Sequence, residues 1–281
     1  MREARVTVSE GRELSLTDIG ADDWPCVFFF HGAPSSRLRL AYLEPAFLDA
    51  KIRVVSPDRP GYGGSSVQLD RSIADWPTDV TALADALKVT RFAVAGHSSG
   101  GPYALACAEM TPDRVSSCIV LGGVTDFAWR GAWEGYLDIE QRLMRLPDLA
   151  SVVVACERAF GADGSGFMSA AGLELPEPDA RIYADENIAR LLTASRAEAF
   201  RQGVIGYAQD VFLQGQPWPF RPGAIRMPVH VLHGEADTLL PLAHSTHTAE
   251  LIRGSMLRVV RGHGHFSILA LLPTLARTLA A

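Results

Sequence analysis

Gly96-His97-Ser98-Ser99-Gly100 directly follows the apolar, strand-like run 91–95 and leads into a helical pattern over 99–110. A serine between two glycines at this spacing fits a sharp turn from a strand into a helix, because a residue without a side chain lets the two elements approach closely. The free amides at the start of the helix then point toward the serine. The same pattern also occurs in ordinary tight turns. The flanking strand and helix are what favour Ser98 as an activated nucleophile, with Gly96 and Gly100 as the glycines of its turn.

Short strand-like runs alternate with longer helical patterns through most of the chain. A continuously apolar run or a period of two indicates a strand, and apolar residues every three to four positions indicate a helix. Strands are predicted at 4–9, 13–18, 25–30, 51–56, 91–95, 114–121, 228–233 and 255–261, and helices at 72–87, 99–110, 241–252 and 266–279. The first two runs predict an antiparallel hairpin. The alternation that follows predicts an α/β protein with a mostly parallel sheet and helices on both faces.

Residues 124–216 interrupt this alternation. They contain helical and loop patterns with many aromatic residues, and their one β-branched cluster, 152–154, is too short to indicate a sheet. Residues 161–166 and 175–179 have the composition of loops. We interpret 124–216 as a mainly helical cap or lid inserted into a core made of 1–123 and 217–281. Most of its aromatic side chains are expected to form its own core, and a minority to line a pocket above the sheet.

A serine nucleophile needs a base, and two histidines near the C-terminus are candidates. Serine is a poor nucleophile at neutral pH unless an imidazole takes its proton. His263 and His265 both lie between a predicted strand and a predicted helix. His265 is next to the start of the helix, where its ring can reach over the edge of the sheet. We therefore predict His265 as the base, with His263 as the alternative.

The base in turn needs an orienting acid, which lies between serine and histidine in the chain order of such sites. Asp237 follows the predicted strand 228–233, at the sheet edge that carries the other candidates. Aspartate is also common in loops after strands, where it caps a turn. We predict Asp237 as the acid, with Asp126 and Glu235 as alternatives.

Acyl transfer also needs amide donors for the oxyanion that forms on the attacked carbonyl. The amide of Ser99 follows the nucleophile directly. A second donor is available in His31-Gly32-Ala33-Pro34, which follows the buried strand 25–30. Proline has no N–H, so this donor has to precede Pro34. We predict the backbone amides of Ala33 and Ser99.

Composition narrows the cofactors, partners and location. The net charge is −6 with no basic stripe, which argues against a nucleic-acid partner. No apolar run approaches the roughly 20 residues that span a bilayer, and the N-terminus does not resemble a secretory signal. Four widely spaced cysteines indicate a reducing, cytoplasmic setting without a disulfide framework. His244, His247 and Glu250 fit a solvated helix surface better than a metal site, so we expect neither metal nor cofactor.

Taken together, these motifs resemble the α/β-hydrolase superfamily, in particular its cap-bearing branch of esterase-like serine hydrolases. The resemblance is carried over nearly the whole chain by 31–34, 58–65, 96–100, 233–237 and 262–266. It implies an eight-stranded sheet, the catalytic triad Ser98, His265 and Asp237, and an oxyanion hole at Ala33 and Ser99. Members that open epoxides or cleave carbon–halogen bonds have aspartate at the position of Ser98, which argues against both reactions.

The predicted function is hydrolysis of an ester, thioester or lactone of a small or medium acyl compound through an acyl-enzyme. Three alternatives stay open: a carbon–carbon bond hydrolase, a cofactor-free perhydrolase, and a catalytically silent member that binds a ligand. The sequence identifies neither the substrate nor the oligomeric state, because no motif marks the residues of 124–216 that would form the pocket.

Overall fold

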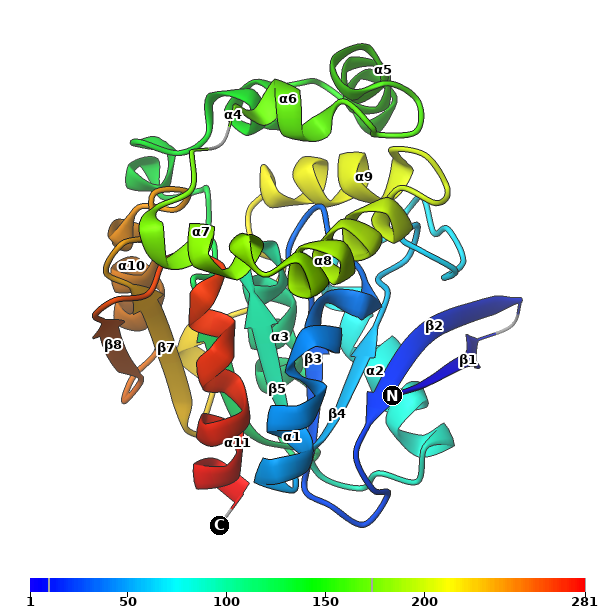
Figure 1. The fold of residues 1–281 in the computed structure, drawn as a ribbon, viewed down its shortest axis with the longest axis vertical. Helices are drawn as coiled ribbons and strands as arrows, with labels where there is room; N and C mark the ends of the chain where they lie inside the picture. Colours follow the sequence, from blue (N-terminus) through cyan, green and yellow to red (C-terminus); the bar gives the residue numbers. More distant parts are fainter. Residues whose placement is uncertain (10, 173, 281) are drawn as a thin grey trace.

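An eight-stranded sheet forms the centre of the computed structural model, which describes residues 1–9, 11–172 and 174–280 (Figure 1). The strands run in the order β1-β2-β4-β3-β5-β6-β7-β8. Their bounds are β1 (Arg2–Ser9), β2 (Arg12–Ile19), β3 (Cys26–Phe30), β4 (Arg53–Pro57), β5 (Phe92–His97), β6 (Val115–Leu121), β7 (Val229–Gly234) and β8 (Met256–Val260). β2 is antiparallel to β1 and to β4, and every other pairing is parallel. The predicted α/β fold with a mostly parallel sheet is confirmed.

Helices cover both faces of this sheet, and β3 shows how its sequence requires them. All five residues of β3 are buried. Val27 and Phe29 pack in one hydrophobic cluster with α1 (Glu44–Ala50) and α11 (Leu272–Ala280), which lie in front of the sheet in Figure 1. Phe28 and Phe30 point the other way, toward α2 (Trp76–Ala86) and α3 (Gly101–Met110). Alternate residues of a strand face opposite sides, so a strand covered on both sides has to be apolar throughout.

The remaining helices of the core are short or lie at its edges. α10 (Leu242–Leu251) packs on β7 and β8. Six 3-10 helices complete the described elements: η1 (Arg37–Leu43), η2 (Ile73–Asp75), η3 (Ser98–Gly100), η4 (Arg130–Trp133), η5 (Pro222–Ala224) and η6 (Ser267–Leu271). The predicted helices 72–87 and 99–110 each begin as a 3-10 turn, η2 and η3, before α2 and α3 continue them.

Between β6 and β7 the described residues form helices and loops without a strand. The helices are α4 (Asp138–Met144), α5 (Leu149–Phe160), α6 (Phe167–Ala171), α7 (Glu177–Ala184), α8 (Glu186–Ala199) and α9 (Ile205–Gln214). We call α4 to α9 the helical insertion; Figure 1 shows them together at one end of the sheet. Phe160, Phe167 and Tyr207 meet edge to face in its interior. These aromatic side chains form a core of its own for the insertion.

One predicted loop is partly helical. Residues 175–179 have a loop-like composition, yet α7 begins at Glu177. Pro178 lies in the first turn of α7, where the missing N–H of proline costs no helical hydrogen bond. Proline at this position therefore starts a helix rather than breaking one.

A buried cluster of charges fixes α9 to the core. The Asp210 carboxylate accepts hydrogen bonds from Arg59 and Arg71 and from the hydroxyls of Tyr62 and Tyr103. Burial would raise the pKa of Asp210, but the two guanidiniums lower it below its usual range. The same Arg59 donates to the backbone oxygen of His31, next to the predicted oxyanion loop. Asp210 thus links the helical insertion to the loop after β3.

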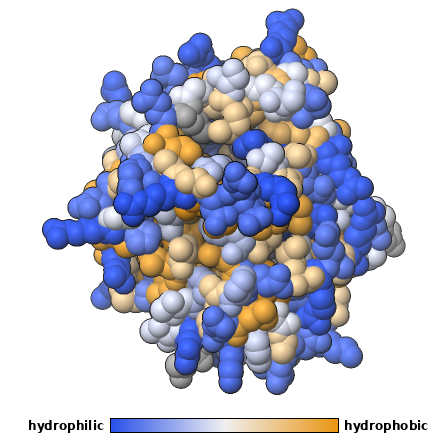
Figure 2. All heavy atoms as spheres, in the orientation of Figure 1, coloured by the Kyte–Doolittle hydropathy of each residue, from blue (hydrophilic) through white to orange (hydrophobic). Residues whose placement is uncertain are grey.

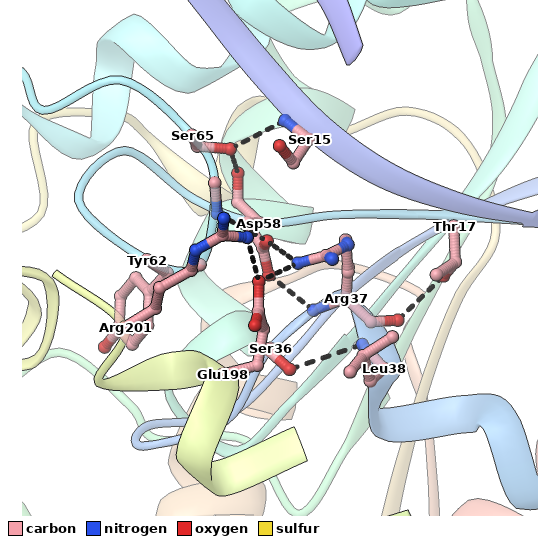
Figure 3. A network of polar contacts seen from close by, with 12 residues as sticks. Ser15, Thr17, Ser36, Arg37, Leu38, Asp58, Tyr62, Ser65, Glu198 and Arg201 are labelled. Atoms are coloured by element: carbon pink, nitrogen blue, oxygen red, sulfur yellow. Dashed lines mark hydrogen bonds and ion pairs between the residues drawn. The ribbon is translucent and has the colours of Figure 1, made fainter. Parts of the chain in front are cut away.

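A second cluster joins α8 to the core (Figure 3). Arg37, at the start of η1, forms ion pairs with Asp58 after β4, with Glu198 of α8 and with Glu3 of β1. Asp58 is fully buried and also accepts the backbone amide of Arg37 at 2.6 Å. Three carboxylates from separate parts of the chain therefore surround one guanidinium.

Figure 2 shows both polar and apolar side chains on the face of the molecule that is turned to the viewer. Figure 2 shows polar side chains along the band where α7 and α8 lie, and apolar side chains gathered below this band.

The four cysteines are all buried and unpaired: Cys26, Cys107, Cys118 and Cys156. Among the described residues, no helix has both the length and the apolar character needed to cross a membrane.

Candidate active site

The turn around Ser98 joins β5 to η3 and α3 in a conformation that its neighbours permit. Ser98 has a positive φ of 53°, which is rare for a residue with a side chain and costs backbone strain. A Cβ atom added at Gly96 would lie 2.2 Å from the carbonyl oxygen of Gly100, and one added at Gly100 would lie 2.1 Å from that of Phe30. Both glycines are therefore needed for the strand and the helix to pack this closely.

Ser98 lines a cavity between the end of the sheet and the helical insertion. The cavity measures about 90 Å³, and one water molecule needs roughly 10–15 Å³ of such space, so there is room for a small organic group. Besides Ser98, the core contributes Ala33, Ser99 and His265 to its wall. The helical insertion and the segment leading into it contribute Tyr136, Leu137, Glu140, Phe167, Met168, Tyr183, Leu192 and Arg196.

Asp237 and His265 are joined by a hydrogen bond. Asp237 Oδ2 lies 2.8 Å from His265 Nδ1, and its Oδ1 accepts the amides of Leu239 and Leu240 at 2.9 Å each. Burial would raise the pKa of Asp237, but the charge and hydrogen bond of His265 outweigh it and lower the pKa to about 2. A carboxylate charged at neutral pH therefore holds Nδ1, which must carry the proton of this bond.

Ser98 and His265 line the same cavity without a direct hydrogen bond. Among the described residues, the Ser98 hydroxyl forms no hydrogen bond. Such contacts are often longer in unliganded enzymes and tighten when the substrate binds. Because Nδ1 of His265 carries the proton that is shared with Asp237, its Nε2 atom is unprotonated and can accept a proton.

The alternative acid and base residues make other contacts. The His263 ring bonds to the backbone oxygen of Arg261 at an exposed position. Asp126 accepts the amide of Ala128 in its own turn, and Glu235 lies beside Arg261 with 55% of its side chain exposed. None of these three side chains contacts His265 or lines the cavity. The structure brings Asp237 and His265 together and leaves the alternatives apart.

Two backbone amides are available beside the serine. Ala33 and Ser99 both line the cavity, and their N–H groups donate to no acceptor among the described residues. A Cβ atom added at Gly32 would lie 3.1 Å from Cβ of Ser98, so the chain before Ala33 passes directly against the serine. The pair is suited to hold a negatively charged oxygen.

His97, the residue before the serine, supports the ring of His265. Its Nε2 lies 2.8 Å from the backbone oxygen of His265, and the two rings lie 4.7 Å apart. Burial, with His265 and Arg39 nearby, lowers the pKa of His97 well below its usual range. His97 is therefore neutral and donates from Nε2, which places a ring but no charge beside His265. No pattern in the sequence indicated this role.

Asp179 of α7 holds the chain that follows His265. Its buried carboxylate accepts the amides of Phe266 at 3.1 Å and Ser267 at 2.8 Å, and the Ser267 hydroxyl at 2.7 Å. These donors are at the start of η6, so Asp179 satisfies amides that a helix leaves free at its first turn. Asp179 lies in the segment 175–179 that was predicted to be a loop, and nothing in its sequence neighbours indicated a partner so far away in the chain.

Glu140 of α4 brings a buried carboxyl group to the wall of the cavity. It accepts hydrogen bonds from the hydroxyls of Tyr136 and Tyr207, and the amide of Gln214 lies 3.4 Å away. Burial raises the pKa of Glu140, and these three donors partly offset the effect. In the sequence it appears only as an acidic residue in the first turn of a helix. In the described part of the chain, no three His, Cys, Asp or Glu side chains converge as metal ligands would.

Comparisons with known proteins agree with this architecture. Residues 25–270 match the protein family described as alpha/beta hydrolase fold. The chain is 26% identical over 270 residues to a bifunctional esterase/perhydrolase from Acinetobacter calcoaceticus, covering 92% of each chain. It is 25% identical over 273 residues to a 2-hydroxy-6-oxo-2,4-heptadienoate hydrolase from Pseudomonas putida, covering 93% of this chain and 89% of that one.

The fold is also shared with solved structures. A crystal structure of a hydrolase from Pseudomonas aeruginosa aligns with a TM-score of 0.71, at 21% identity, over 98% of this chain and 95% of the other. At this identity the likeness concerns the arrangement of helices and strands alone.

Proposed function

The chain belongs to the α/β-hydrolase family, and we propose that it is a serine hydrolase that cleaves an ester of a small or medium acyl compound. The triad of this proposal is Ser98, His265 and Asp237. The observation that carries it is the Asp237–His265 hydrogen bond at the wall of the cavity that Ser98 lines. A nucleophile, a base and an orienting acid are the three groups that acyl transfer needs.

In the first half-reaction, the Ser98 hydroxyl attacks the carbonyl carbon of the ester. His265 takes the proton of Ser98 on Nε2, and Asp237 stabilises the imidazolium through Nδ1. The oxyanion binds the amides of Ala33 and Ser99, each of which supplies roughly 3–4 kcal/mol to the transition state. When the tetrahedral intermediate collapses, the alcohol leaves with the proton from His265, and the acyl group stays on Ser98.

The second half-reaction releases the acid. His265 removes a proton from a water molecule, and the resulting nucleophile attacks the acyl-enzyme. The same two amides hold the second oxyanion. Its collapse breaks the bond to Ser98, and the proton on His265 returns to the serine oxygen. The enzyme is then ready for another substrate.

The helical insertion is assigned the role of a cap. Together with the segment leading into it, the insertion provides eight of the twenty residues that line the cavity, among them the apolar Leu137, Phe167 and Leu192. A cap that excludes water strengthens the contacts made by the oxyanion amides. The likeness to the Acinetobacter calcoaceticus esterase/perhydrolase supports ester cleavage. Attack of hydrogen peroxide instead of water on the same acyl-enzyme would give a peracid, which is the alternative that this relative raises.

A fluorophosphonate probe, which modifies activated serines, tests the proposal. We expect the wild type to form one adduct at neutral pH, Ser98→Ala to form none, and the surface control Ser165→Ala to react like the wild type. We also expect turnover of short acyl esters. No adduct on a folded wild-type protein would overturn the hydrolase and favour a ligand-binding role. An adduct with peracid formation but no ester hydrolysis would instead favour the perhydrolase.

A further inference from the structure

Arg39 is a buried cation without a partner at the wall of the cavity. It lies on η1 and is only 6% exposed. Its Nη2 atom is buried and has no hydrogen-bond partner among the described residues. Burying a guanidinium donor without an acceptor destabilises the folded protein, because the donor loses its hydrogen bonds to water. Natural proteins rarely keep such a group unless something binds it.

Arg37, two residues earlier on the same short helix, shows the opposite situation (Figure 3). It is about as buried as Arg39 and pairs with Asp58, Glu198 and Glu3. The fold therefore supplies three carboxylates to the arginine that holds its parts together. It supplies none to the one that faces the cavity.

Phe266 holds Arg39 close to the catalytic histidine. The Cζ atom of Arg39 lies over the Phe266 ring, 4.9 Å from its centroid, and the His265 ring lies 5.3 Å from the same centroid. An arginine that stacks on an aromatic face keeps the donors in the plane of its guanidinium available. Arg39 is thus a positioned donor beside the reacting groups.

Arg196 adds a second cation from the helical insertion. It lies on α8, lines the same cavity and forms no ion pair among the described residues. Glu140 is the acidic residue of the cavity wall, but its oxygens accept from Tyr136 and Tyr207 rather than from either arginine. The positive charge of the two arginines is therefore left for a ligand.

From these contacts we propose that Arg39 and Arg196 bind a carboxylate at the far end of the acyl group, so that the substrates are monoesters of short dicarboxylic acids. The carboxylate accepts hydrogen bonds from the in-plane N–H groups of Arg39 and is attracted by the positive charge of Arg196. The ester carbonyl then lies at Ser98. The size of the cavity limits the acyl chain to a few carbons. The substrate class rests on the proposed hydrolase; the anion site itself does not.

Monoethyl succinate and ethyl levulinate test this directly, because the second replaces the carboxylate by a neutral methyl ketone of similar shape. We expect the wild type to have a kcat/KM at least ten-fold higher for monoethyl succinate. Arg39→Met should lower that value about 10–100-fold, the range for a lost charge-assisted hydrogen bond, and change the levulinate value less than three-fold. Arg39→Lys should keep part of the preference, and Arg196→Met should lose less than Arg39→Met.

Arg190→Met is the matched control, since Arg190 is an exposed residue of the same α8 that bonds to Asn187. It should leave both esters unaffected. Equal kcat/KM for the two esters in wild type and in Arg39→Met, with Ser98 still labelled by the fluorophosphonate, would overturn the carboxylate site and leave the hydrolase standing.

Calorimetry with succinate separates the two proposals further. Succinate should bind the wild type with millimolar or tighter affinity and bind Arg39→Met at least ten-fold more weakly. This result would support the anion site even if Ser98 proved unreactive. Absence of binding to a folded wild type would overturn it. Arg39→Met removes an unsatisfied buried donor, so its melting temperature should equal or exceed that of the wild type.

Discussion

His265 and Asp237 are joined at 2.8 Å although they belong to different loops, one after β8 and one after β7. The parallel strands β7 and β8 are neighbours, so the loops that follow them emerge at the same edge of the sheet. The carboxylate of Asp237 is itself held by the amides of Leu239 and Leu240. These two amides fix the orientation of the Asp237 carboxylate, which in turn orients the ring of His265.

Replacing the proposed base should remove activity. Because His265 bonds to Asp237 and lines the cavity, we expect His265→Ala to lower kcat by about 10⁴-fold or more on any ester the enzyme turns over. His263→Ala removes a half-buried ring that bonds only within its own loop, and it should keep at least half of the activity. Steady-state kinetics check both, and a larger loss in His263→Ala would reverse the assignment.

Asp237→Asn should leave the histidine in place but in the wrong tautomer. An amide in place of the carboxylate no longer stabilises the imidazolium, which typically costs about 10⁴-fold in kcat. Asp126→Asn changes only a turn contact with Ala128 and should stay within two-fold of the wild type. Comparable losses in both variants would leave the acid unassigned.

The stability of the protein should fall in acid partly because of Asp237. Its pKa is about 2 when folded, against an ordinary value of 3.8, so its contribution is complete above pH 3.8 and is lost as the pH falls through 2. Lowering the pKa from 3.8 to about 2 corresponds to about 2 kcal/mol of stability. Urea unfolding between pH 5 and pH 2 should show a steeper loss for the wild type than for Asp237→Asn. Parallel curves would contradict the charged pair.

Asp179→Asn should reduce activity although Asp179 lies on α7 of the helical insertion and does not line the cavity. The amide nitrogen it introduces faces the N–H groups of Phe266 and Ser267, so the chain after His265 has to shift. A displacement of about 1 Å can cost about 10²-fold, and we expect kcat to fall 10–100-fold with KM little changed. A slower fluorophosphonate reaction at Ser98, measured well below the melting temperature, would separate positioning from unfolding.

Asp185→Asn is the control for this prediction. Asp185 caps the start of α8 by accepting the amides of Asn187 and Ile188 at an exposed site, and asparagine caps as well as aspartate. It should behave like the wild type. A kcat for Asp179→Asn equal to that of this control would show that α7 does not position His265.

Asp210→Asn should destabilise the protein more than any surface change. It leaves Arg59 and Arg71 buried without their shared carboxylate, and breaking a buried charge cluster in this way costs about 3–5 kcal/mol. Asp22→Asn removes a carboxylate that is 71% exposed and paired with Arg2, and its melting temperature should stay close to that of the wild type. Thermal and urea unfolding measure both, and similar stability in the two variants would refute the structural role of Asp210.

Local patterns in the sequence were enough to predict the sheet and the turn at its centre. The apolar run 25–30 indicates a strand covered on both sides, and β3 is buried at every residue. Gly96 and Gly100 indicate the close approach that the structure shows at Ser98. An apolar run and a pair of glycines each involve only a few neighbouring positions, so both features can be recognised directly in the sequence. The prediction of a loop at 175–179 was wrong because proline is typical both of loops and of the first turn of a helix, and α7 begins at Glu177.

The contacts of the site depend on tertiary structure. His263 and His265 have nearly the same sequence surroundings, and the ring that meets Asp237 is decided by how two loops 28 residues apart leave adjacent strands. Arg37 and Arg39 likewise share one short helix, yet one lies among three carboxylates and the other faces the cavity. Asp179 reaches Ser267 across 88 residues. The residue pattern alone was enough to predict the strands and the sharp turn at Ser98 that the structure shows. Which charges surround the serine depends on how the helical insertion packs on the sheet. A helical pattern in the sequence shows which face of the helix is buried, but it does not identify the element against which that face packs.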